Sequence, residues 1–92
     1  MKDNEEVRQY IEDEGYEDVV IFENPDYAPA FIGVSSEGRA IYDYERMVTC
    51  LMERDGISKE EAIEFIEYNT LRSLAYVENA PVVLMPVQGG NE

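Results

Sequence analysis

The sequence YDYERMVTCLMERDGISKEEAIEFIEYNTLRSL, residues 42–74, predicts two helices joined by a tight turn, and this pair decides the fold. Asp43 stands where a helix cap is needed, and Gly56 lacks the Cβ that disfavours the left-handed conformation of a helix stop. Between them, apolar residues recur at the i, i+3, i+4, i+7, i+8 spacing of one helical stripe: Tyr44, Met47, Val48, Leu51 and Met52.

The second helix is predicted to begin after Ser58, because Ser58 and Glu61 have the spacing of a capping box. A helical wheel places its apolar side and its acidic side opposite each other: Ala62, Ile63, Ile66 and Leu74 against Glu60, Glu64 and Glu67. Asn69, Thr70 and Ser73 fall within or beside the apolar arc, and a buried Asn must be hydrogen-bonded. We expect either that Asn69 ties the helix to a strand edge or a loop carbonyl, or that Asn69 and Tyr76 form a small polar pocket.

Upstream of this pair, the sequence predicts one helix and three strands. The helix is capped by Asn4, presents Val7, Tyr10 and Ile11, and ends at Gly15. Strands are predicted where β-branched and aromatic residues cluster, at residues 19–22, 31–34 and 39–42, and a last strand at 82–85 precedes Pro86. We therefore predict one α+β domain over residues 1–92 in the order α-β-β-β-α-α-β. A small, mostly antiparallel sheet of about four strands would carry the helix pair on one face, with 88–92 as a loose tail.

The charge of the chain restricts its partners. Twenty-one acidic residues against seven basic ones give a net charge of −14, and histidine is absent. Such a surface repels nucleic-acid backbones and anionic membranes, so we expect neither direct nucleic-acid binding nor membrane association. A single cysteine, Cys50, and an N-terminus without an apolar signal region predict a cytoplasmic protein.

The sequence offers little for catalysis. Without histidine there is no ordinary general base near neutral pH and no imidazole metal ligand, and Cys50 has no partner to activate it. The acidic pairs on the second helix are expected to face water, which screens them, whereas a carboxylate that acts as a catalytic acid needs burial or a close like charge. We predict no catalytic residue, no metal site and no cofactor.

One flank of the second helix has the composition of a protein interface. Phe65, Tyr68 and Arg72 follow one another at i, i+3 and i+7, and aromatic residues with Arg are enriched at binding hot spots. The alternative is that Phe65 belongs to the core and Tyr68 only covers it. The candidate partner-binding residues are Glu60, Glu64, Glu67, Tyr68 and Arg72.

Several of these stretches resemble a group of small acidic proteins encoded by phages, prophages and mobile elements of Gram-positive gut bacteria. The resemblance spans about residues 31–81 and rests on FIGV at 31–34, GR at 38–39, YDYERMV at 42–48, DG at 55–56, and EEAIEFIEYNT at 60–70 with Arg72. It implies a mobile-element context and assigns no activity. Related sequences often carry proline at the position of Ala75, which would end the helix near Leu74.

These observations predict a non-enzymatic accessory protein that binds another protein, with a basic protein as the sharper form of that hypothesis. One alternative is a nucleic-acid mimic that inhibits a host DNA- or RNA-binding protein through the row formed by Glu60, Glu64 and Glu67. A second is a small ligand-binding domain or enzyme with its pocket near Asn69 and Tyr76. The thin first helix, the short last strand with Pro86, and Leu71 outside the core also predict a homodimer, because they leave apolar surface uncovered.

Overall fold

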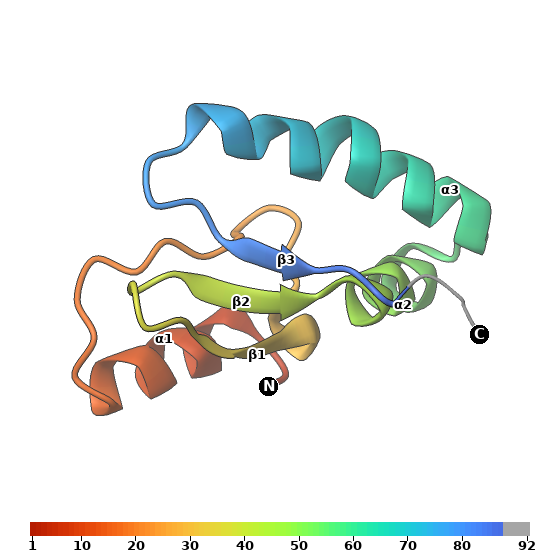
Figure 1. The fold of residues 1–92 in the computed structure, drawn as a ribbon. Helices are drawn as coiled ribbons and strands as arrows, with labels where there is room; N and C mark the ends of the chain where they lie inside the picture. Colours follow the sequence, from red (N-terminus) through yellow and green to blue (C-terminus); the bar gives the residue numbers. More distant parts are fainter. Residues whose placement is uncertain (88–92) are drawn as a thin grey trace.

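The protein combines three α-helices with one three-stranded sheet in the computed structural model, which describes residues 1–87 (Figure 1). The expected loose tail at 88–92 lies outside the described residues. The elements in chain order are α1 (Asn4–Asp13), the 3₁₀ turn η1 (Ala28–Ala30), β1 (Phe31–Val34), β2 (Ala40–Asp43), α2 (Tyr44–Asp55), α3 (Lys59–Phe65), the π-helical segment η2 (Ile66–Leu71), the 3₁₀ turn η3 (Leu74–Tyr76) and β3 (Val82–Leu84).

The predicted helix pair is confirmed, including its caps. The side chain of Asp43 accepts a hydrogen bond from the Arg46 N–H at 3.0 Å, and Gly56 ends α2 with a φ of 65°. Ser58 and Glu61 form the reciprocal capping box, with both bonds at 3.1 Å. These signals act within one turn of helix, which is why the sequence located them correctly.

The sheet has three strands in the order β1-β2-β3, not the four that the sequence predicted. β1 and β2 form the expected antiparallel hairpin, but β2 and β3 are parallel, so the sheet is mixed. The reason is the connection between β2 and β3, in which α2 and α3 return the chain to the end of the sheet where β2 begins (Figure 1). A parallel pair needs such a long crossover.

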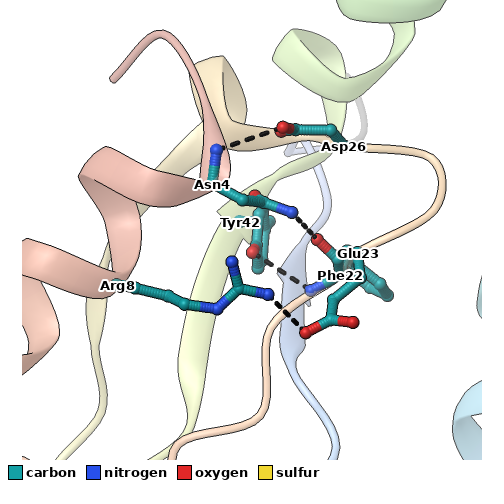
Figure 2. Close-up of polar contacts among 6 residues, drawn as sticks. All are labelled: Asn4, Arg8, Phe22, Glu23, Asp26 and Tyr42. Carbon is teal, nitrogen blue, oxygen red and sulfur yellow. Dashed lines mark hydrogen bonds and ion pairs between the residues drawn. The ribbon is translucent and has the colours of Figure 1, made fainter.

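The missing fourth strand is the apolar run at 19–22, which is packed inside the protein without joining the sheet. Ile21 is buried, yet the backbone of Phe22 bonds to side chains instead of to a strand. Its N–H donates to the Tyr42 hydroxyl at 3.3 Å, and its carbonyl accepts from the Asn4 side chain at 2.8 Å (Figure 2). Both backbone groups of the partly buried Phe22 are therefore satisfied without a ladder partner.

The same bonds correct the predicted role of Asn4. Asp3 caps α1, accepting from the Glu6 N–H at 3.0 Å, while Asn4 is a buried residue within the first turn. Its backbone N–H donates to Asp26 at 3.1 Å, and its side chain holds Phe22 (Figure 2). The polar side chain that resembled a local cap therefore makes a contact across the fold.

One hydrophobic core joins the helices to the rear face of the sheet. Val7 of α1, Tyr42 of β2, Leu51 of α2 and Ile66 of η2 are almost fully buried in it. The ring of Tyr10 meets Phe31 edge-on with centroids 5.8 Å apart, and α1 lies behind the sheet in Figure 1. The helix pair therefore shares the covering of this face with α1 and the segment that carries Phe22.

The opposite face of the sheet, which we call the outer face, is apolar. Phe31, Ala40 and Tyr42 point into the core, so strand alternation turns the residues between them outward. In the part of the chain that is described, no helix lies in front of this face (Figure 1). The aliphatic residues of the outer face are Ile32, Ile41, Val82 and Leu84, and the register places Gly33 and Asp43 on the same side, opposite Ile41 and Leu84.

The end of the second helix departs from α geometry in a way that changes which side chains are buried. A π segment holds about one residue more per turn, so the side chains that follow it are rotated relative to an α wheel. Thr70 is buried and bonds to the Tyr27 hydroxyl at 2.9 Å, and Leu71 packs against the core. Asn69 is exposed, and its side chain donates to the Phe65 carbonyl at 3.2 Å.

Truncation of the core residues of α2 and η2 should destabilise the protein strongly. Leu51→Ala and Ile66→Ala each remove a fully buried side chain and should lower the free energy of unfolding by about 2–5 kcal/mol. Ser58→Ala removes one cap and should cost about 1 kcal/mol. Urea denaturation measures each value, with exposed Glu53→Ala as the control. A nearly neutral Leu51→Ala would contradict this description of the core.

Stability should also fall at alkaline pH because burial raises the pKa of Tyr42 to about 12. The folded-state pKa lies above the unfolded value near 10, so the neutral phenol contributes fully below about pH 10. This contribution is lost as the pH rises towards about 12, by roughly 2–3 kcal/mol. Guanidinium denaturation of wild type and Tyr42→Phe across this range measures it. Tyr42→Phe should have a lower free energy of unfolding at neutral pH, but this free energy should fall less with rising pH than that of the wild type. An equal dependence on pH in the two proteins would contradict the prediction.

Candidate protein-binding surface

An exposed aromatic flank runs from the end of α3 into η2, and we define it as Phe65, Tyr68 and Arg72. Phe65 is 38% exposed and Tyr68 63% exposed, so neither is a core residue. The guanidinium carbon of Arg72 lies 5.7 Å from the centroid of the Tyr68 ring, within cation–π distance. The interface interpretation of the sequence is thereby favoured over the one in which Tyr68 covers a buried Phe65.

The aromatic flank borders a shallow hollow of about 390 Å³. Glu61 and Glu64 line it together with Phe65 and Tyr68, and Ile57 extends its apolar floor. Both glutamates are exposed, so the hollow presents aromatic surface beside two carboxylates, of which the Glu61 carboxylate also accepts from the Ser58 N–H in the capping box. Such a surface complements a partner that combines an apolar anchor with basic side chains.

The three glutamates proposed as an acidic row are all exposed but do not act alike. Glu60 and Glu64 have no hydrogen bond to a described residue, whereas Glu67 accepts one from the Tyr44 hydroxyl at 3.1 Å. Burial, and then this bond to the carboxylate, raise the pKa of Tyr44. Glu67 therefore fastens η2 to α2, which weakens the hypothesis that the three residues form one free row.

Asn69 and Tyr76 do not form the predicted polar pocket: Asn69 lines the shallow hollow beside the aromatic flank, and its side chain bonds to the Phe65 carbonyl of its own helix and not to a strand edge or loop. Asn69 is exposed and Tyr76 is 90% exposed, because the π segment turns Asn69 outward and Tyr76 lies in the 3₁₀ turn that ends the helix. The polar residue that is buried here is Thr70, bonded to Tyr27. A wheel with 3.6 residues per turn placed Thr70 beside the apolar arc, and this was the only signal in the sequence.

Three features of the described residues bear on protonation, metal binding and membrane insertion. Burial raises the pKa of Tyr27, Tyr42, Tyr44 and Cys50, so these four groups stay protonated and neutral near pH 7. Within residues 1–87, no group of three or more Cys, Asp or Glu side chains is arranged to hold a metal ion. No helix in that range is both long and apolar enough to cross a bilayer.

Comparison with protein-family models, curated proteins and solved structures gives no match to this chain. The function must therefore be inferred from the residues of the surface itself. The resemblance to small acidic proteins of mobile elements stays a prediction.

Proposed function

We propose that this protein is a non-enzymatic accessory protein that binds a basic protein through the aromatic flank. The observation that carries the proposal is the exposed stack of Arg72 on Tyr68 beside Phe65. Large aromatic side chains left in solvent at adjacent turns of one helix contribute little to the stability of the fold. They contribute strongly when a partner removes them from water.

The charge of the chain supports a basic partner. Glu61 and Glu64 border the aromatic flank, and the whole chain carries a net charge of −14. This field would steer a positively charged protein towards the surface and accelerate its association. Tyr68 would then supply the apolar contact that slows dissociation, since rim charges affect mainly the rate of association.

Two further arguments favour this proposal over the alternatives from the sequence. A mimic of nucleic acid needs free carboxylates at regular spacing, and the Glu67 carboxylate is hydrogen-bonded to the Tyr44 hydroxyl. An enzyme or ligand-binding domain at Asn69 and Tyr76 needs an enclosed site, and both residues are exposed. We also infer a mobile-element context, in keeping with the resemblance.

Photo-crosslinking tests the proposed partner. With p-benzoylphenylalanine in place of Tyr68, the protein should capture a basic protein in a Gram-positive cell, and mass spectrometry identifies it. Binding of the purified partner to Tyr68→Ala should be weaker by about 2 kcal/mol or more. Glu61→Gln with Glu64→Gln should instead slow association and flatten its salt dependence.

Two controls make this test specific. Tyr16→Ala removes another partly exposed tyrosine, in the turn after α1, and should leave binding unchanged. Tyr68→Ala should change the free energy of unfolding by no more than about 1 kcal/mol, because Tyr68 lies outside the core. The proposal fails if crosslinking from position 68 captures only acidic or random proteins, or if both tyrosine variants bind equally well.

We further propose that the protein self-associates through the outer face of its sheet. Ile32 is 45% exposed and Leu84 47% exposed, on two strands that flank Ile41 of β2. Four residues of the outer face are aliphatic, and Asp43, which caps α2, lies at its end. A second copy with the same face can cover it by two-fold symmetry, the commonest arrangement of soluble dimers.

Self-association should depend on both this face and the salt concentration. Analytical ultracentrifugation of the wild type should show a dimer that strengthens with added salt, because salt screens the repulsion between two chains of charge −14. Leu84→Glu should be monomeric. Tyr76→Glu adds the same charge at another exposed site and should still dimerise. A wild type that stays monomeric at high protein and salt concentration contradicts this proposal.

A further inference from the structure

The basic residues of this acidic chain are unevenly distributed. Three of the seven, Lys2, Arg46 and Arg54, line a single hollow of about 410 Å³ between α2 and the start of the chain, which we call the basic hollow. One carboxylate, Glu53, also lines it, so three positive charges and one negative charge leave +2. The sign is opposite to that of the whole chain, which carries −14.

The α2 side of the basic hollow is one stripe of the helix. Arg46, Thr49, Cys50, Glu53 and Arg54 follow the i, i+3, i+4, i+7, i+8 pattern that places side chains on a common face. Cys50 is buried at the base of the stripe, and both arginines are exposed. The stripe is adjacent to the apolar one, so packing of α2 against the core fixes the direction in which the arginines point.

The cations of the basic hollow lack the partners that an acidic chain would be expected to provide. Among residues 1–87, Arg8 and Glu23 form an ion pair, but no carboxylate oxygen lies within salt-bridge distance of the side-chain nitrogens of Lys2, Arg46 or Arg54 (Figure 2 shows the Arg8 pair). The backbone N–H of Lys2 donates to the Glu6 carboxylate at 2.6 Å. Arg54 is held by a hydrogen bond to the backbone carbonyl of Asp26, which leaves its charge uncompensated. Side-chain cations that form no ion pair with a described carboxylate are available to an external anion, although Glu53 lines the same hollow.

The spacing of the cations indicates the kind of anion. Arg46 and Arg54 are eight residues apart, a rise of about 12 Å along α2, and Lys2 contributes from another segment. A single small anion cannot contact all three unless their long side chains converge, whereas a ligand with two or more anionic groups can contact them together. The Thr49 hydroxyl donates to the Glu45 carbonyl at 3.1 Å and adds no donor, so recognition falls to the three cations.

We propose that the basic hollow binds a small multivalent oxyanion, a molecule that carries two or more phosphate or carboxylate groups. The arginines provide planar forks that suit both kinds of oxyanion, and Lys2 provides a third positive charge. The volume falls within the range of small-molecule sites. This site is separate from the aromatic flank on α3 and η2, so it is independent of the proposed protein partner.

Titration of the ¹⁵N-labelled full chain with pyrophosphate and with citrate tests the proposal. NMR should show saturable shifts of amides along 46–54 and near Lys2 with at least one of the two anions. Tighter binding of pyrophosphate identifies phosphate as the preferred group, and tighter binding of citrate identifies carboxylate. The proposal is overturned if neither anion gives a saturable change at these amides by about 10 mM, a limit for weak binding.

Charge-matched variants separate a specific site from general electrostatics. Arg46→Gln should weaken binding of the preferred anion about tenfold, since it removes one charge-assisted contact. Arg39→Gln removes the same charge from the β1–β2 hairpin and should leave the affinity within about twofold. Equal weakening by both variants would overturn the proposal. Arg46 is exposed, so the Arg46→Gln spectrum should otherwise match that of the folded wild type.

Discussion

The fold depends on how the backbone of Phe22 is satisfied. A peptide that is partly shielded from water and lies outside regular structure needs partners for its N–H and its carbonyl, and Phe22 is such a residue. Tyr42 and Asn4 provide both, and they come from β2 and α1, so two short contacts join three separate parts of the chain (Figure 2). Asp26 extends this connection, because it accepts from the N–H of Asn4 and from that of Ala28, where η1 begins. The sheet can stop at three strands because these side chains take the place of a fourth.

This arrangement explains how much of the fold could be predicted from the sequence. The caps at Asp43, Gly56 and Ser58 follow from residues within one turn, and the β1–β2 hairpin follows from a short connection with Gly38 at a φ of 84°. The run at 19–22 has strand composition, but only Ile21 is buried and the run is not a strand. Its hydrogen bonds come from residues about 20 positions away, and neither periodicity nor propensity carries that information.

The candidate surface could also be predicted from the sequence only in part, and the prediction fails at the π segment. Phe65, Tyr68 and Arg72 were placed together on an exposed flank from their helical spacing, and the Arg72–Tyr68 stack agrees with it. The sequence could not show whether Asn69 or Thr70 is buried, because the additional residue in the π turn determines which of them faces Tyr27. A helical wheel drawn with 3.6 residues per turn cannot show this wider turn. The contact between the Thr70 and Tyr27 side chains, 43 positions apart, is a property of the packed structure.

The charges suit the two proposed binding surfaces for different physical reasons. A basic protein approaching the aromatic flank is attracted by the whole field of a −14 chain, and salt weakens that attraction over a Debye length of about 8–10 Å. An anion approaching the basic hollow is repelled by the same field until it reaches Lys2, Arg46 and Arg54, so its binding must come from short-range contacts. Moderate salt screens the long-range repulsion more than these contacts. The two surfaces should therefore respond differently to ionic strength, although both lie on helices joined by the single turn at Gly56.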